Sequence, residues 1–309
     1  MMNTLENCFF KYFTEPHFLE NGLFRFTQPA ALNDPLEAFP RLKFGDLSEE
    51  DFEIARQKAK DFGYDNPSEE VLRDLFLTPF ASHRFDEKAA PGLWPHTEPR
   101  LRAKPFRTID EIDMAFAERA VELLLDMANR EFGIFSLSEN YNNSLWAHYG
   151  NDHKGAAIAF DREHPSFKEV TFPITYSDRP IFVSSYYGVV RICGHQIQHE
   201  EILSSSLKGF PLRLLFLKKL EWQWEKEWRQ IRYLSKPQVS TAKDEQGHPI
   251  HLFPLPASSV KAIILGSRSS SHLQEKVINF KTGRPMWRNV PIYRRRMTPR
   301  GDFFEEEIA

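Results

Sequence analysis

The segment KKLEWQWEKEWRQIRYL, residues 218–234, places three tryptophans and three glutamates within eight positions and then continues as a strand-like run. In a strand that begins near Trp224, alternation puts Glu225, Glu227 and Arg229 on one face and the tryptophans on the other. Both carboxylates would then enter one site. Burial and mutual repulsion would raise the pKa of one of them, which suits a general base or a group that stabilises a developing cation. Arg229 would orient one carboxylate.

The same segment also permits a structural interpretation. If it stays helical, Trp224 and Trp228 lie four residues apart on one packed face. Glu221 and Glu225 are then solvated. Spacing alone leaves both interpretations open.

Composition limits the class of protein. The chain has 309 residues, 41% hydrophobic and 27% charged content, and a net charge of −3, so no global charge attracts nucleic acid. Its two cysteines, Cys8 and Cys193, form neither a disulfide framework nor a four-thiolate zinc site. No secretory signal and no apolar run of about 20 residues is present. The sequence predicts a cytoplasmic protein that does not enter the membrane.

Hydrophobic periodicity predicts strands that alternate with fewer helices. This pattern predicts an α+β fold with a twisted, mostly antiparallel core sheet and helices packed around it. We expect a single domain over residues 1–309 with a helical or irregular insertion at about 48–130, irregular at 82–108, and a frayed acidic tail at 302–309. The expected strands are 7–13, 22–27, 133–138, 155–160, 169–177, 227–234, 251–255, 260–266 and 290–297. The expected helices are 48–62, 67–77, 108–132, 196–209 and 271–283, with a short turn of helix at 144–150.

A second informative segment is FSLSENYNNSLWAHYGNDHKGAAIAFD, residues 135–161. Ser136 and Ser138 emerge on one side of a strand, and Trp146 and Tyr149 share one side of a short helix. Lys154 adds a cation in a tight polar loop. Hydroxyls, rings and a cation suit a nucleotide-like ligand, although a packed strand, turn and strand with a surface loop fits equally well.

Five motifs resemble one bacterial family. KYF, NGLFRFTQPAALNDPLE, the 135–161 segment, WQWEKEWRQIRYL and VKAIILG occur in an order similar to that of domain-of-unknown-function family 2971, across about residues 9–293. Leu36 stands where that family usually has phenylalanine after Asn-Asp-Pro.

The order of these motifs is also similar to that of the ADP-ribosyltransferase fold. The resemblance implies an NAD-consuming transferase, such as a bacterial toxin or phage-defence effector, with NAD as substrate, no metal, and a protein or nucleic acid as acceptor. It implies that Glu227 is the catalytic acid and that Glu225 supports the acceptor. It also implies that Lys11 or Arg25 on the first strands binds NAD, together with Ser136 and Ser138, and that Trp146 or Tyr149 is the stacking ring. Further candidate ligand-binding residues are Tyr12, Asn33 and Asp34 in the shaped loop, and Lys154.

Two other classes of function stay open. His195 and His199 are four residues apart, the spacing with which one helix can present two imidazoles to a metal, as in a metal-dependent hydrolase or nuclease. Arginines at 294–296, with Arg284, Arg288 and Arg300 nearby, would suit a non-enzymatic sensor that binds a nucleotide or nucleic acid. No nucleophile elbow, P-loop or dinucleotide-binding glycine motif is present.

Overall fold

The computed structural model describes residues 5–32, 42–45, 49–72, 111–186, 189–235, 237 and 242–309. These residues belong to two compact units. The first comprises Met1–Pro35, Glu131–Ser177 and Lys218–Ala309, and the second comprises Leu36–Arg130 and Asp178–Leu217. The insertion predicted at 48–130 falls wholly within the second unit, and its irregular part at 82–108 lies outside the described residues. The single domain over residues 1–309 stays a prediction.

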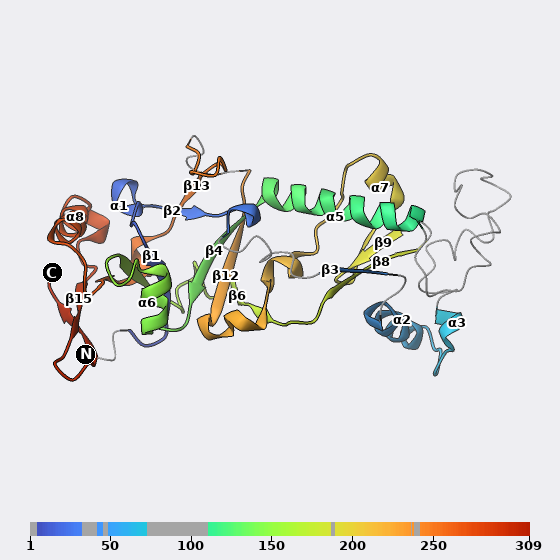
Figure 1. The fold of residues 1–309 in the computed structure, drawn as a ribbon, viewed down its shortest axis with the longest axis horizontal. Coiled ribbons are helices and arrows are strands. Elements are labelled where there is room, and N and C mark those ends of the chain that lie inside the picture. The colour runs from blue at the N-terminus through green and yellow to red at the C-terminus, as the bar shows by residue number, and fades with distance from the viewer. Residues whose placement is uncertain are drawn as a thin grey trace. The chain divides into compact units, whose positions relative to one another are not determined.

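The first unit is built on an eight-stranded sheet in the order β16-β15-β14-β5-β1-β4-β12-β6. Figure 1 labels five of these strands, β1, β4, β6, β12 and β15. All neighbouring strands in the sheet are antiparallel except β14 and β15, which helix α8 (Ser271–Thr282) connects in parallel. The mixed α+β class with a large, mostly antiparallel sheet is thus confirmed. The strands are β1 (Cys8–Phe13), β4 (Phe132–Ser138), β5 (Ala156–Asp161), β6 (Thr171–Pro173), β12 (Glu227–Tyr233), β14 (Val260–Leu265), β15 (Ile292–Met297) and β16 (Phe303–Glu307).

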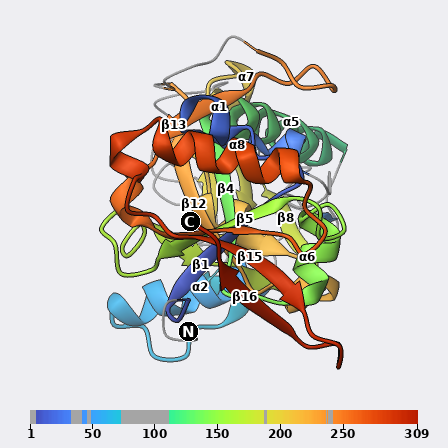
Figure 2. The ribbon, with the colours of Figure 1, turned by 90° about the vertical axis from the view of Figure 1, so that its left-hand side faces the viewer.

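The two faces of this sheet pack against different layers. On the first face, Phe9 and Phe135 join an aromatic core with Phe24 of β2 (Leu23–Phe26). Strand β2 pairs with β13 (His251–Pro254), and α1 (Phe18–Asn21) and α8 complete that layer (Figure 2). On the second face, helix α6 (Asn143–Tyr149) packs Leu145 and Trp146 against Phe10, Tyr12 and the alanines of β5. Successive residues of one strand, such as Phe9 and Phe10 of β1, therefore face different layers.

The second unit contains a four-stranded sheet in the order β10-β9-β8-β3. Strand β3 is parallel to β8, and the other pairs are antiparallel. The strands are β3 (Leu42–Gly45), β8 (Ile181–Tyr186), β9 (Val189–Ile192) and β10 (His195–Ile197), and the helices are α2 (Glu49–Asp61), α3 (Glu69–Leu72), α7 (His199–Leu203) and α5 (Glu111–Glu131), which ends in the first unit. The helices predicted at 48–62 and 108–132 are confirmed, and the strands of this sheet were not foreseen.

Several short elements connect the larger ones. Strand β7 (Thr175–Tyr176) pairs with β11 (Leu217–Lys218). The 3₁₀ helices are η2 (Pro29–Ala31), η6 (Leu212–Phe216), η7 (Leu220–Glu225), η8 (Ala257–Ser259) and η9 (Pro285–Trp287). No described helix combines the length and apolar character needed to cross a membrane.

Three predicted elements differ from the structure. The strand expected at 169–177 is two strands, because Pro173 has no N–H to continue the ladder. The helix expected at 196–209 is limited to α7, where the side chain of Gln198 and that of Glu201 form a capping box that starts the helix at His199. The tail expected to fray is strand β16, whose pairing with β15 is reinforced by a 2.7 Å ion pair between Arg296 and Glu306.

The loop between α6 and β5 is tightly constrained. Asn151, Asp152 and His153 all have positive φ, at 51°, 49° and 66°. A Cβ placed on Gly155 would lie 2.1 Å from the carbonyl oxygen of Phe13, and one on Gly266 would lie 2.1 Å from that of His153. Only glycine allows these backbones to approach so closely.

Substitution of Gly155 should therefore destabilise the first unit. We expect Gly155→Ala to lower the free energy of unfolding by about 2 kcal/mol or more, because backbone atoms must shift to admit the methyl group. Gly45→Ala, where a Cβ meets no atom within 4 Å, is the matched control and should change it by less than about 0.5 kcal/mol. Denaturant unfolding measures both, and equal effects would contradict the steric argument.

Candidate active site

The tryptophan-rich segment is a 3₁₀ helix followed by a strand, so neither sequence interpretation is wholly right. Helix η7 ends at Glu225, Lys226 turns the chain with φ 44°, and β12 begins at Glu227. Strand geometry thus starts three residues later than Trp224. Glu221 is exposed, as the helical interpretation expected, whereas Glu225 is buried.

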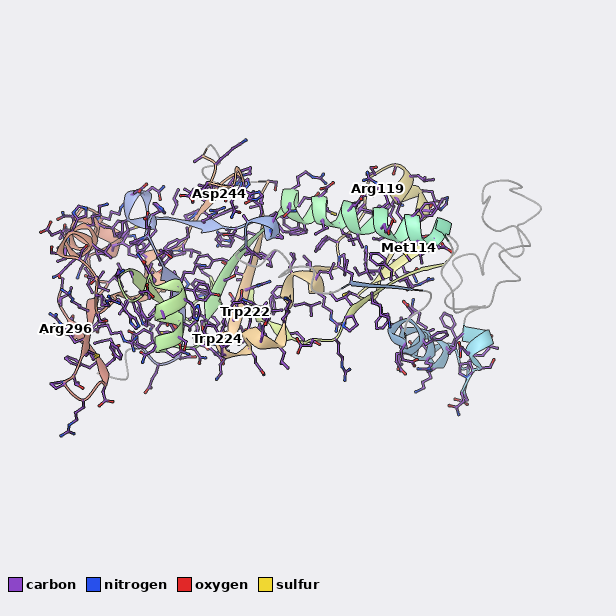
Figure 3. The ribbon with its side chains drawn as sticks, in the orientation of Figure 1. Met114, Arg119, Trp222, Trp224, Asp244 and Arg296 are labelled. Atoms are coloured by element: carbon purple, nitrogen blue, oxygen red, sulfur yellow. The ribbon has the colours of Figure 1, made fainter. Side chains whose placement is uncertain are left out.

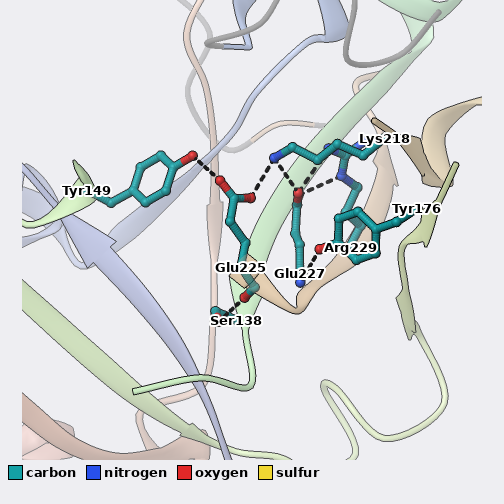
Figure 4. A network of polar contacts seen from close by, with 7 residues as sticks. All are labelled: Ser138, Tyr149, Tyr176, Lys218, Glu225, Glu227 and Arg229. Carbon is teal, nitrogen blue, oxygen red and sulfur yellow. Dashed lines mark hydrogen bonds and ion pairs between the residues drawn. The ribbon is translucent and has the colours of Figure 1, made fainter. Parts of the chain in front are cut away.

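Glu225 and Glu227 still converge, because the left-handed turn at Lys226 folds their side chains onto one ammonium group. Nζ of Lys218 lies 2.6 Å from Oε2 of Glu225 and 3.0 Å from Oε2 of Glu227 (Figure 4). Nε of Arg229 donates to Oε1 of Glu227 at 2.7 Å. We call Lys218, Glu225, Glu227 and Arg229 the charge cluster; each of the four is at most 5% exposed.

Neutral hydroxyls surround the charge cluster. Tyr149, at the end of α6, donates to Oε1 of Glu225 at 2.5 Å. Ser136 of β4 hydrogen-bonds the carboxylate of Glu227, and Ser138 donates to the backbone oxygen of Glu225 at 2.5 Å. The hydroxyl of Tyr176 accepts from the backbone N–H of Glu227 at 2.7 Å. The structure therefore brings together both predicted glutamates, both serines and Tyr149.

The electrostatics of Glu227 differ from the sequence expectation. Burial raises the pKa of its carboxyl group, but the charges of Arg229 and Lys218 outweigh burial and hold the pKa at about 2. The expected rise in pKa is wrong for Glu227, because two cations lie within hydrogen-bond distance. Its carboxylate is ionised at neutral pH, so it suits the stabilisation of positive charge and not proton donation.

Aromatic rings border the charge cluster. Trp222 and Trp224 project from η7 (Figure 3) and are half-buried. Nζ of Lys218 lies 5.3 Å from the ring centroid of Trp222, and the Trp224 ring lies 5.3 Å from that of His148 on α6. Half-exposed rings beside buried charges are suited to contact a flat or sugar-like ligand.

The predicted residues on the first strands lie elsewhere. Lys11 shares the first face of the sheet with Phe9 and Phe13, and its Nζ lies 5.1 Å from the ring of Phe135. The charge cluster is on the second face, because Glu227 and Arg229 pair with Ser138 and Ser136. The prediction that Lys11 joins Glu227 in one site is wrong, since alternation sends its side chain through the other side of the sheet.

Arg25, Trp146 and Tyr12 also have other partners. Arg25 forms a 2.6 Å ion pair with Asp244. Trp146 is fully buried and packs edge-on to Tyr12, so it has no free face for a ligand and the stacking role predicted for it is wrong. The buried Tyr12 hydroxyl donates to the backbone oxygen of Asn140.

Lys154 and the shaped loop complete the set. Lys154 is exposed, and its backbone N–H donates to the backbone oxygen of Asn151 at 2.9 Å. Asn33 and Asp34 lie outside the described residues.

Two members of the site escaped sequence reasoning. Lys218 directly follows the mostly apolar run LRLLFL, residues 212–217. This position is the only local indication in the sequence that its side chain is buried. Tyr176 is brought to Glu227 by the pairing of β7 with β11, which depends on a contact between residues about 40 apart in sequence.

The features behind the two alternative functions are arranged differently from their expectation. His195 lies in β10 and His199 begins α7, so the prediction that one helix presents both imidazoles is wrong. Within the described ranges, no group of three or more His, Cys, Asp and Glu side chains could hold a metal ion. Along β15, Arg295 is buried and Arg296 pairs with Glu306, so the arginine run does not form one continuous exposed patch.

Comparisons with protein-family models, with curated proteins and with solved structures gave no match. The function is therefore inferred from the geometry of the site.

Removal of the shared cation should destabilise the protein. In Lys218→Met, two carboxylates stay buried with one counter-ion fewer, and we expect a loss of about 3–5 kcal/mol in the free energy of unfolding. Lys226→Met is the matched control, because that side chain is 57% exposed and lies 3.8 Å from Glu139; it should cost less than about 1 kcal/mol. Urea unfolding at pH 7 compares them, and similar losses would show that the charge cluster is not a coupled unit.

Acid should remove the contribution of Glu227 to stability. The pKa is about 2 in the folded chain and 4.5 ordinarily, so this contribution is complete above about pH 4.5 and is lost as the pH falls towards 2. The shift corresponds to about 3 kcal/mol. The difference in unfolding free energy between wild type and Glu227→Gln should shrink between pH 5.5 and 3, whereas Glu221→Gln, at an exposed glutamate, should follow wild type. A constant difference for Glu227→Gln would contradict the low pKa.

Proposed function

We propose that the chain is an NAD-consuming ADP-ribosyltransferase-like enzyme of the bacterial toxin or phage-defence type, with Glu227 and Glu225 as its catalytic pair. The observation that carries this proposal is the convergence of two carboxylates on one positive charge, at 2.6 and 3.0 Å. Cleavage of NAD at the nicotinamide bond builds positive character on the ribose, which preorganised carboxylates stabilise. The resemblance of motif order to the ADP-ribosyltransferase fold supports the same assignment.

The two glutamates take different roles. Glu227, held ionised by Arg229 and Lys218, stabilises the ribosyl cation as the C1′–N bond breaks and its electron pair leaves with nicotinamide. The acceptor forms the new bond to C1′, and its proton passes to Glu225. No external oxidant or reductant is required.

In the absence of substrate, the ammonium of Lys218 neutralises the two carboxylates. In this proposal the ribose takes the position between the two carboxylates that the ammonium occupies, and the side chain of Lys218 moves aside when NAD binds. Tyr149 and Ser136 are half-buried next to the same carboxylates. In this proposal they contact the ribose hydroxyls and the nicotinamide ring when the ammonium moves.

The direct test is release of nicotinamide from NAD, with candidate protein and nucleic-acid acceptors present. Wild type should release nicotinamide, and Glu227→Gln should be slower by about 10²-fold or more, because a preorganised charge is lost. Glu221→Gln removes an exposed carboxylate from the same 3₁₀ helix and should keep wild-type activity.

Folding and binding are measured on the same samples. Circular dichroism confirms that Glu227→Gln is folded at the assay temperature, and calorimetry measures NAD binding. Binding of NAD without nicotinamide release would contradict the enzymatic proposal and would favour a nucleotide sensor. No NAD binding at millimolar concentration would overturn both and leave a structural charge cluster.

A further inference from the structure

Another buried cation, outside the charge cluster, lies against the C-terminal strand. Arg295 of β15 is 5% exposed, and its Cζ lies 4.1 Å from the ring centroid of Phe303 in β16 and 5.2 Å from that of Tyr141. One guanidinium nitrogen, Nη2, donates to Oδ1 of Asn143 at 2.7 Å. The proposed catalytic pair has no part in this arrangement.

Four buried nitrogens of Arg295 and the two rings next to it lack hydrogen-bond partners among the described residues. They are Nε and Nη1 of Arg295, Nε1 of Trp146 and Nδ1 of His153. Trp146 is fully buried, and the Cζ of Arg295 lies 5.8 Å from its ring centroid. A buried donor without an acceptor costs about 1–3 kcal/mol, so a group of them indicates an acceptor that the chain itself does not supply.

These groups are held in place by independent contacts. The ring of His153 is stacked between Trp146 and Phe303, at centroid distances of 6.1 and 5.6 Å and interplanar angles of 11° and 6°. Its backbone is left-handed, with φ 66°, and the absence of a side chain on Gly266 allows that residue to lie against the backbone oxygen of His153. Strain of this kind persists where the surroundings fix it and is common at binding sites.

The positive charge of Arg295 is only partly neutralised. Within the described ranges, its ion-pair partner is Glu305 of β16, whose Oε1 is 3.8 Å from Nε and accepts a 2.8 Å hydrogen bond from Tyr141. Burial, together with the charges of Arg295 and Arg268, lowers the pKa of His153. The imidazole is therefore neutral at pH 7 and adds no positive charge to repel Arg295.

We propose that Arg295, Trp146 and His153 form an oxyanion-binding site for a phosphoryl group. A guanidinium offers donors in a fixed plane that match phosphate oxygens. The indole N–H donates to a third oxygen, and Nδ1 of His153 donates in one of its two tautomers. Strand β16 is the edge strand of the sheet and pairs only with β15 among the described strands, so in this proposal the ligand enters when β16 separates from β15. This site is independent of the function proposed for the charge cluster.

The first experiment is a titration of the full chain with inorganic phosphate, followed by nuclear magnetic resonance of the indole N–H groups. The chain has six tryptophans, and the signal that disappears in Trp146→Phe belongs to Trp146. This signal should shift with phosphate in a saturable manner and should not shift with chloride at equal ionic strength. AMP, as a phosphate monoester, distinguishes a nucleotide source from free phosphate.

The variants then test the donors. Arg295→Met should weaken phosphate binding at least tenfold, and Arg296→Met, which removes the neighbouring exposed arginine, should leave binding unchanged. Glu305→Gln should tighten binding several-fold, because the carboxylate nearest to Arg295 loses its charge. Tighter phosphate binding requires a folded variant, so misfolding cannot produce this result.

Three results would overturn the proposal. One is a Trp146 signal that moves equally with phosphate and chloride. Another is phosphate affinity that is the same in Glu305→Gln and wild type. The third is equal loss of binding in Arg295→Met and Arg296→Met, which would assign the effect to general surface charge. Buried water would then be the acceptor of these donors.

Discussion

The ammonium of Lys218 holds the central part of the first unit together. It joins two carboxylates that would otherwise repel each other at the junction of η7 and β12. Each ionised group in the charge cluster is removed from water, which is costly unless every partner is in place. Strand β11, helix η7 and strand β12 must therefore assemble together. The left-handed turn at Lys226 makes this closure possible, since it brings Glu225 and Glu227 to the same cation.

Stability alone does not explain such a cluster. Well-packed apolar residues in place of a buried ion pair are often as stabilising or more so. Here four ionised residues lie beside half-buried rings and a tyrosine that donates directly to Glu225. The low pKa of Glu227 keeps its charge fixed. A permanent charge next to adaptable aromatic surface is an arrangement that supports chemistry, and it is the basis of the proposed enzymatic role.

Local periodicity predicted most strands of the eight-stranded sheet and the serine face, because alternation is set within each segment; it did not predict the strands of the second unit. The pairing of Ser136 with Arg229 and of Ser138 with Glu227 places that face next to the glutamates, as the sequence indicated. Alternation also excludes Lys11, which follows Phe9 on the opposite face. The role of Lys218 and the strand character of the acidic tail could not be predicted, because both depend on partners distant in sequence. The ADP-ribosyltransferase-like fold and the family resemblance stay predictions.

Helix α6 contacts both the charge cluster and the surroundings of Arg295. Its last residue, Tyr149, donates to Glu225, whereas Trp146, one turn earlier, lies against Arg295. Both contacts are on the second face of the sheet. Tyr149 contacts a carboxylate, whereas Trp146 lies next to a guanidinium. The charge cluster holds two carboxylates around a cation, and Arg295 is a cation with a carboxylate beyond hydrogen-bond distance. A displacement of α6 would alter both surroundings at once, because the helix is too short to bend between Trp146 and Tyr149.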